Sequence, residues 1–248
     1  MDGYHLDTYG ERWSPVFDDL APDHPDTRAS ADRLLVWAAS GPVLELGIGT
    51  GRVALLLAEG GLEVHGIDIS PAMLARLATK PGADAVTAWT ADFADFACDS
   101  RYSLVYVLAS TFLMLLTEEQ QFGCMRSVAR CLLPDGLFVL EAEVPDLRRF
   151  EDGQFVRIQE MRSDLVELLL ARHVPAVQRI DYQRVRIKAA GIRLLPVSYR
   201  YAGPVELDEM AAAGGLRLVE RHGGWQGEPF ESDSRRHVSV YTADAGAR

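Results

Sequence analysis

The 248-residue sequence has few cysteines and no long apolar run. Cys98, Cys124 and Cys131 make an odd count, and none belongs to a C-x-x-C pair with metal-site spacing, so we expect reduced, mostly buried thiols and no bound metal. No stretch holds 18 apolar residues without a charge, and the N-terminus lacks the basic and apolar regions of a signal peptide. These absences predict a soluble cytoplasmic protein that does not bind membranes.

Basic side chains are outnumbered, with 25 Lys and Arg against 36 Asp and Glu and a formal net charge of −11. This charge opposes the counterion release that drives nucleic-acid binding, and no Lys/Arg run makes a local basic surface. We therefore expect no nucleic-acid partner. The composition, 48% hydrophobic and 25% charged, is that of a globular protein, and the length suits one main domain with a small insert.

Strand and helix patterns alternate over the first 145 residues. Residues 1–30 are broken by prolines and predict one short helix, and a helix is expected over 31–39. Ser70 and Pro71 supply an N-cap and a first-turn proline for a helix that reaches residue 78. Other helices are expected over 52–59 and about 118–132. Together with five short apolar segments, they predict a parallel, doubly wound sheet, with strands at 43–46, 63–67, 85–89, 104–108 and 137–142.

The pattern changes after residue 145 to period-two alternation, which predicts a small antiparallel sheet. A helix at 205–213 and two strands resembling a hairpin, at 216–221 and 237–241, follow. The expected fold class is α/β, a doubly wound seven-stranded Rossmann-like sheet with a small antiparallel β insert after the fifth strand. We divide the chain into an arm or lid (1–30), a core (31–149), an insert that covers the substrate or makes a dimer contact (150–203), and a C-terminal completion of the core (204–248).

A glycine-rich loop follows the first predicted strand. Gly47 allows a sharp exit from the strand, Gly49 removes a Cβ that would block a ligand, and Gly51 lets a helix approach closely. The dinucleotide fingerprint G-x-G-x-x-G would need a glycine at position 52, which is Arg52. Glu45 could balance an ammonium group, which S-adenosylmethionine (SAM) has and NAD lacks. The loop taken alone could also be an ordinary strand-to-helix turn.

Acidic residues follow the next two strands. Asp68 stands where a carboxylate accepts hydrogen bonds from ribose hydroxyls, although it could instead prepare the helix start at Ser70. Asp92 can accept from an adenine amino group while Phe93 packs on the ring. Acidic residues at successive strand ends favour a nucleoside site.

These residues together resemble the class I SAM-dependent methyltransferases over roughly residues 31–145, in the segment 45–51, Asp68, Asp92 and the turn at 132–136. The segments 92–96, 109–112 and 223–230 look like a bacterial small-molecule branch, similar to aminosugar N-methyltransferases and cypemycin-type peptide α-N-methyltransferases. The resemblance implies that Gly47 and Gly49 line the methionine part of SAM, and Asp68 the ribose. By the same resemblance, further cofactor contacts come from Glu45, Gly51, Ile69, Asp92, Phe93, Leu108 and Ala109. Leu-Ala-Ser-Thr at 108–111, instead of Asn-Pro-Pro-Tyr, argues against methylation of DNA bases or glutamine.

Methyl transfer is an in-line displacement in which positioning in a water-poor site matters most, so a dedicated catalytic residue is not required. Candidates for a general base are Glu143, His222 and Tyr9, with Glu141, His173 and Tyr201 as further possibilities. Glu143 follows the fifth strand at the edge where open α/β sheets place their sites, but it could be a solvated turn carboxylate. The histidines could equally be structural.

Acceptor contacts are expected from the arm and from a glycine-rich C-terminal loop. The arm aromatics either pack on the sheet or form a lid, and large side chains in the loop are either exposed or face the substrate. The candidates are Tyr4, Trp13, Thr111, Tyr201, Trp225 and Phe230.

Three functions remain open from the sequence: an N- or O-methyltransferase for a small molecule of bacterial secondary metabolism, a peptide α-amine methyltransferase, and a SAM-binding protein without transfer. The expected partner is a small molecule or short peptide, and a homodimer stays open.

Overall fold

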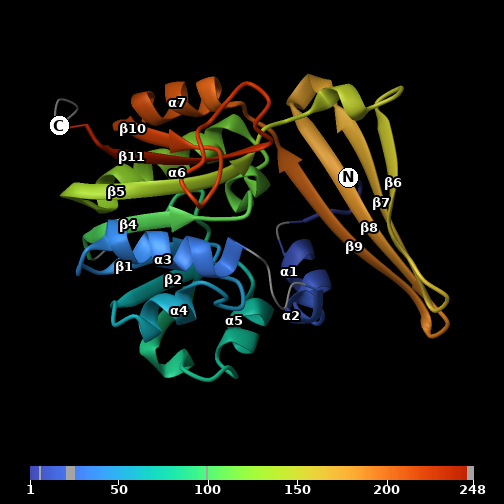
Figure 1. The fold of residues 1–248 in the computed structure, drawn as a ribbon, viewed down its shortest axis with the longest axis horizontal. Coiled ribbons are helices and arrows are strands. Elements are labelled where there is room, and N and C mark those ends of the chain that lie inside the picture. Colours follow the sequence, from blue (N-terminus) through green and yellow to red (C-terminus); the bar gives the residue numbers. More distant parts are fainter. Residues whose placement is uncertain (6, 21–25, 99, 245–248) are drawn as a thin grey trace.

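The computed structural model describes residues 1–5, 7–20, 26–98 and 100–244, and its core is one seven-stranded sheet (Figure 1). The strand order is β10-β11-β5-β4-β1-β2-β3. The first five strands in sequence run parallel, and β11 is antiparallel to both β5 and β10. The strands are β1 (Val43–Leu46), β2 (Val64–Asp68), β3 (Val86–Thr90), β4 (Tyr102–Val107), β5 (Leu132–Glu143), β10 (Leu216–His222) and β11 (Arg236–Ala243).

Helices cover both faces of this sheet, which explains why its central strands are apolar runs without alternation. All four residues of β1 are buried. Leu34 and Leu57 pack in one cluster with Val43 and Leu104, whereas Met125 packs in a second cluster on the other face. One face carries α3 (Asp26–Ala38), α4 (Ala54–Glu59) and α5 (Pro71–Leu77), and the other α6 (Glu118–Cys131) and α7 (Pro204–Ala213).

Local capping fixes where two of these helices begin. Ser70 Oγ accepts a hydrogen bond from the Met73 amide, and Pro71 opens α5, as the sequence predicts. At α6, Thr117 and Gln120 form a reciprocal capping box.

A second sheet of four antiparallel strands, in the order β6-β7-β8-β9, projects beside the core (Figure 1). The prediction of a doubly wound seven-stranded sheet with an antiparallel insert after the fifth strand is therefore confirmed. The insert strands are β6 (Gln154–Met161), β7 (Leu165–Val174), β8 (Arg179–Lys188) and β9 (Gly191–Arg200). Short 3-10 turns lie at η1 (Ala83–Ala85), η2 (Thr111–Met114), η3 (Leu147–Arg149) and η4 (Pro175–Val177).

The N-terminal arm joins the two sheets. It carries two short helices, α1 (Thr8–Trp13) and α2 (Phe17–Leu20), where the sequence predicts one. Tertiary contacts explain the extra helix, because α1 packs between α5 and β9 and Trp13 Nε1 donates to the Pro196 carbonyl at 2.9 Å. The next helix, α3, begins at Asp26, ahead of its predicted start.

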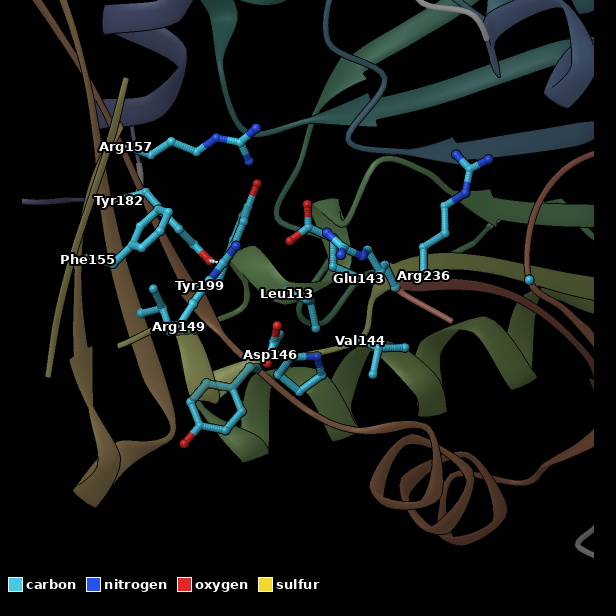
Figure 2. Close-up of a pocket in the computed structure, with 15 residues that line it drawn as sticks. Leu113, Glu143, Val144, Asp146, Arg149, Phe155, Arg157, Tyr182, Tyr199 and Arg236 are labelled. Atoms are coloured by element: carbon cyan, nitrogen blue, oxygen red, sulfur yellow. Dashed lines mark hydrogen bonds between the residues drawn. The ribbon is translucent and has the colours of Figure 1, made fainter. Parts of the chain in front are cut away.

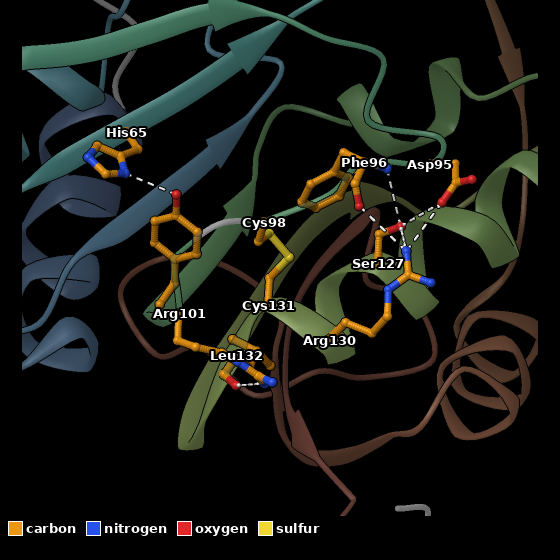
Figure 3. The surroundings of a disulfide bond; sticks show 10 residues. His65, Asp95, Phe96, Cys98, Arg101, Ser127, Arg130, Cys131 and Leu132 are labelled. Atoms are coloured by element: carbon orange, nitrogen blue, oxygen red, sulfur yellow. Dashed lines mark hydrogen bonds and ion pairs between the residues drawn. A yellow bond between two sulfur atoms is a disulfide. The ribbon is translucent and has the colours of Figure 1, made fainter.

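The expectation of reduced thiols is wrong for two of the three cysteines. Cys98 and Cys131 form a disulfide, while Cys124 is free and buried (Figure 3). The two are 33 residues apart in sequence, yet their Cα atoms lie 5.6 Å apart because the segment between β3 and β4 runs past the end of α6. Sequence spacing gave no sign of this approach. Within the described ranges, no helix is long and apolar enough to cross a membrane.

Candidate active site

The glycine loop lies at the carboxyl edge of the parallel strands, where open α/β sheets bind ligands. Gly47, Gly49 and Gly51 all have left-handed backbones, with φ of 72°, 56° and 76°. The amides of Gly47 and Ile48 donate to the Ile67 carbonyl at 2.8 and 3.0 Å, which ties the loop to β2. A side chain at position 51 would collide with Leu77 of α5, so Gly51 serves helix packing.

Asp68 at the end of β2 holds the loop and the start of α5 together. One carboxylate oxygen accepts from the Gly49 amide and the other from the Ser70 amide, both at 2.8 Å. Burial raises the pKa of Asp68, and the two amide hydrogen bonds partly oppose that rise. Asp68 can therefore both fix the start of α5 and face a ligand.

A cavity of about 110 Å³, the loop cavity, adjoins Gly49 and Asp68. It brings together residues of three strand ends, the arm and η2. Those predicted from sequence are Gly47, Gly49, Asp68, Ile69, Asp92, Phe93, Tyr4, Tyr9 and Thr111. Sequence reasoning missed Ser70 and Met73 at the start of α5, and also Gly10, Phe17, Met114, Leu115 and Leu116, whose approach depends on how the arm and the segment at η2 pack.

The arm is fastened beside this cavity by Asp18 of α2. Its carboxylate accepts from Thr50 Oγ1 in the glycine loop and from Lys80 Nζ, both at 2.7 Å, and Arg76 lies 3.3 Å away. Burial acts to raise the pKa of Asp18, but the hydrogen bonds from Lys80 and Thr50 outweigh it, so the pKa is lowered.

Glu45 lies beneath the loop and is only 6% exposed. It does not line the loop cavity, and Tyr106 donates a hydrogen bond to it at 3.0 Å. Burial raises the pKa of Glu45 to about 8, while the Tyr106 hydroxyl and Arg52 act in the opposite direction.

Leu108 and Ala109, after β4, line a different cavity of about 480 Å³ together with Arg52 and Glu141. Ala109 and Ser110 have φ of 51° and 62°, a left-handed conformation that costs energy for residues other than glycine. The Ala109 amide donates to Glu141 at 2.8 Å, and Ser110 Oγ accepts from the Glu143 amide at 3.0 Å. Such strained backbone held by neighbours is concentrated at functional sites.

A cavity of about 650 Å³ lies between the end of β5 and the second sheet, and we call it the sheet cavity (Figure 2). Of the predicted residues, Glu143 and Tyr201 line it. Burial raises the pKa of Glu143; nearby Arg149 opposes this and Glu141 adds to it. Sequence reasoning missed Arg149, Phe155, Arg157, Tyr182, Tyr199 and Arg236. A signal existed in the alternation of aromatic and basic residues along the predicted insert strands.

The loop cavity and the sheet cavity adjoin at η2. Thr111 and Met114 line the first cavity, and Leu113 between them lines the second. Tyr9 from the first cavity lies close enough to Tyr199 of the second to contribute to the raised pKa of Tyr199, which is caused mainly by burial. Ligands in the two cavities would therefore lie on either side of η2.

Trp13 lines neither cavity, but it borders another one of about 310 Å³ together with Glu143 and Tyr199. Three further candidates line none of the cavities described above, because the loop after β10 folds back on the core. His222 pairs with Glu220 at 3.2 Å, and Trp225 is 4% exposed and packs near Trp37. Phe230 lies against Arg221 and His237. Trp225 was expected to be exposed or to face the substrate; it is buried, and the placement of all three residues does not favour acceptor contact.

Comparison with known proteins places the chain in a family. A model described as a methyltransferase domain matches residues 43–136. The cypemycin N-terminal methyltransferase of Streptomyces sp is 30% identical over 206 residues, which cover 80% of this chain and 81% of that protein. The chain belongs to the SAM-dependent methyltransferases. Its cofactor is SAM.

Solved structures agree with this methyltransferase assignment. The CcbJ methyltransferase of Streptomyces caelestis is 39% identical, with a TM-score of 0.91 and coverage of 98% of this chain and 100% of that one. SAM-bound CalS10, an amino pentose methyltransferase from Micromonospora echinaspora involved in calicheamicin biosynthesis, shares the fold, with a TM-score of 0.69, 22% identity and coverage of 97% and 100%.

The residues of the loop cavity fit SAM. Nothing lies closer than 4.0 Å to a Cβ built at Gly49, so a ligand can approach the backbone there. Asp68 offers a carboxylate suited to vicinal hydroxyls, and Ile69 and Phe93 offer apolar surfaces suited to a flat base.

Proposed function

We propose that this methyltransferase moves a methyl group from SAM to an amine or hydroxyl of a small molecule in bacterial secondary metabolism, in the cytoplasm. The observation that carries the proposal is the sheet cavity of about 650 Å³ beside the loop cavity. Its size is typical of small-molecule sites, which run to roughly 300–1,000 Å³. The names of the similar methyltransferases, from cypemycin and calicheamicin producers, support natural-product chemistry.

In this proposal the loop cavity holds the nucleoside of SAM. Asp68 accepts from the ribose hydroxyls, Asp92 from the adenine amine, and Ile69 and Phe93 contact the ring. Gly47 and Gly49 border the methionine part, and Leu108 and Ala109 face the surroundings of the methyl group. SAM supplies an electrophilic methyl group on a sulfonium.

The protein's own contribution is to orient the acceptor, exclude water and accept a proton. Glu143 is the best-placed base, because it lines the sheet cavity and its raised pKa makes it a stronger proton acceptor. Burial raises the pKa of Tyr9 well above the neutral range, so its phenol stays protonated and serves as a donor. His222 lines none of the cavities described above, which leaves it the weaker candidate.

A peptide α-amine acceptor is the second candidate, and the similarity to the cypemycin N-terminal methyltransferase favours it. A SAM-binding protein without transfer is a third. One assay separates the three: the chain is incubated with SAM and panels of small amines, small hydroxyl compounds and short peptides, and products are scored by the mass gain of one methyl group. Methylation of peptides alone would favour the second candidate, and no methylated product in any panel would overturn the proposal.

We also propose that two copies of the chain pair through the outer patch, the apolar residues on the face of the second sheet opposite the sheet cavity. Strand register places Ile158, Leu168, Val185 and Leu194 in one row across the sheet. Met161, Val166, Ile187 and Ile192 form the next row. With Val156, these nine residues make up the outer patch. They carry no charge, so a second copy of the same patch is complementary to it even though each chain has a net charge of −11.

A further inference from the structure

Arg149 lines the sheet cavity, where its guanidinium lies against three aromatic rings. Its guanidinium carbon lies 5.1 Å from the ring centre of Phe155, 5.6 Å from that of Phe150 and 5.7 Å from that of Tyr182. It also donates a hydrogen bond to the Tyr182 hydroxyl. No carboxylate of the described residues forms an ion pair with Arg149. Most of its donors therefore remain available to a ligand.

Arg157 on β6 lines the same cavity and likewise makes no ion pair with the described part of the chain. Three nearby arginines differ in this respect. Arg184 and Arg186 both pair with Glu167, and Arg236 pairs with Asp26 and Glu141. Two guanidiniums that form no direct ion pair with the described residues therefore line one cavity, in a chain with an excess of 11 negative charges.

Glu143 faces the same space from the core sheet. Figure 2 shows its carboxylate between the insert side of the cavity, with Arg149, Arg157 and Tyr182, and Arg236. The cavity thus offers cationic groups on the insert side and a carboxylate on the side of β5. A ligand with an anionic group and a basic nitrogen would satisfy both sides.

We propose that the acceptor is a small amine that carries a carboxylate, an amino acid or a close derivative; this rests on the proposed function. Arg149 and Arg157 bind the carboxylate, since guanidinium matches carboxylate in charge and hydrogen-bond geometry. The neutral amine nitrogen forms the new N–C bond while the S–CH3 bond breaks. Sulfur keeps the electron pair, and the nitrogen passes its proton to Glu143. Glu143 partly offsets the positive charge of the two guanidiniums. A ligand with one carboxylate therefore balances the charge of the cavity better than a dianionic phosphate does.

The acceptor class can be tested by binding alone. The probes are the common α-amino acids, each compared with its primary amide and its decarboxylated amine. Calorimetry is run with the chain saturated with S-adenosylhomocysteine, so no turnover occurs. We expect at least one acid to bind about tenfold or more tightly than its amide, because the amide cannot form charge-assisted hydrogen bonds with the arginines. Equal affinity of acids and amides, or no binding of any acid at about 10 mM, would overturn the inference.

Variants assign the effect to the two arginines. Arg149→Met and Arg157→Met should each weaken binding of the preferred acid about tenfold and leave the amide unchanged. Arg157 is exposed on an edge strand, so its replacement should not disturb folding. Arg148→Met is the matched control, because Arg148 adjoins Arg149 but is 92% exposed and pairs with Asp146. An acid preference that survives both arginine replacements contradicts the inference.

Failure of this inference can be told apart from failure of the proposed function. Methyl gain on amines without an acid preference would keep the proposed function and remove the inference. No methyl gain on any panel member, with S-adenosylhomocysteine still bound, would remove both.

Discussion

Gly49 is the residue at which backbone shape and cofactor access coincide. Its φ of 56° is costly for other residues, by about 1–2 kcal/mol, and its amide is fixed by Asp68. We predict that Gly49→Val weakens SAM binding at least tenfold, because the branched side chain would occupy the loop cavity. The measurement is the dissociation constant for SAM by calorimetry.

Gly61→Val is the matched control for this change. Gly61 also has a positive φ, 89°, and nothing lies within 4 Å of a Cβ built there. Both variants should lose thermal stability, whereas only Gly49→Val should lose affinity. If both bind SAM as the unmodified chain does, the loop does not hold the cofactor. Asp68→Ala, which removes the carboxylate proposed to bind the ribose, should also weaken binding.

Glu45 makes the pH dependence of SAM binding predictable. Burial raises its pKa to about 8, so the side chain is mostly protonated at pH 7 in the free protein. We propose that the ammonium of SAM lies close enough to Glu45 to favour its ionised form, so that binding should lower this pKa and release a proton. Because binding releases a proton below pH 8, affinity should rise as pH increases towards that value.

Calorimetry of SAM binding at pH 7 in two buffers of different ionisation enthalpy measures the protons released. Glu45→Gln cannot ionise and is the control, so it should release fewer protons than the unmodified chain. The same proton count in both proteins would show that Glu45 does not respond to the cofactor.

At the scale of elements, the segment between β3 and β4 is fastened to α6 by the Cys98–Cys131 disulfide. Around that bond, Ser127 Oγ accepts from the Phe96 amide at 3.3 Å and donates to Asp95 at 3.2 Å (Figure 3). The disulfide spans 33 residues, and chain-entropy arguments give up to about 3–4 kcal/mol for such a loop. Reduction should therefore lower the melting temperature by roughly 5–15 °C.

Thermal melts with and without a reductant measure this effect, and Cys98→Ser is the control. Cys98→Ser should melt at the same temperature under both conditions, near that of the reduced unmodified chain. SAM affinity should fall with reduction as well, because Asp92 and Phe93 lie on the same segment. If the unmodified chain melts at the same temperature with and without the reductant, the disulfide does not form in solution.

Elements defined by local chemistry were predictable from sequence. The buried run at 43–46 formed β1 with the predicted bounds, and Ser70 with Pro71 began α5 as expected. Elements that depend on distant contacts were not predictable. The extra arm helix needs β9 and α5 to pack against, and the disulfide needs α6 to meet a segment far from it in sequence.

The same distinction applies to the candidate site. Residues at strand ends, such as Asp68 and Phe93, could be proposed because parallel strands bring their carboxyl ends to one edge. Alternation along the insert strands could assign Arg157 and Tyr182 to a face of the second sheet, but not to the cavity, since the orientation of that sheet over β5 decides which of its faces lines the cavity. Trp225 was misplaced because a glycine-rich loop carries no periodic pattern from which burial could be read.

At the scale of the whole molecule, the two faces of the second sheet have different surroundings. One face, with Tyr182 and Arg157, closes the sheet cavity. The other exposes the outer patch, in which Val156, Ile158 and Ile192 are 66%, 59% and 68% exposed. Contiguous apolar patches of this kind are uncommon on monomers and mark interaction surfaces. Pairing at the outer patch would keep both copies of the sheet cavity open.

The oligomeric state tests this arrangement. Light scattering during size-exclusion chromatography should give twice the chain mass of 27.3 kDa, and Ile158→Asp should shift it to the single-chain mass, because pairing would bury the new carboxylate without a partner. Val36→Asp, at a residue 75% exposed on α3, is the matched control and should leave the dimer intact. A monomeric unmodified chain, or a dimer that tolerates Ile158→Asp, would contradict pairing through this face. Since the outer patch and the sheet cavity lie on opposite faces, the monomeric Ile158→Asp variant should keep its affinity for S-adenosylhomocysteine.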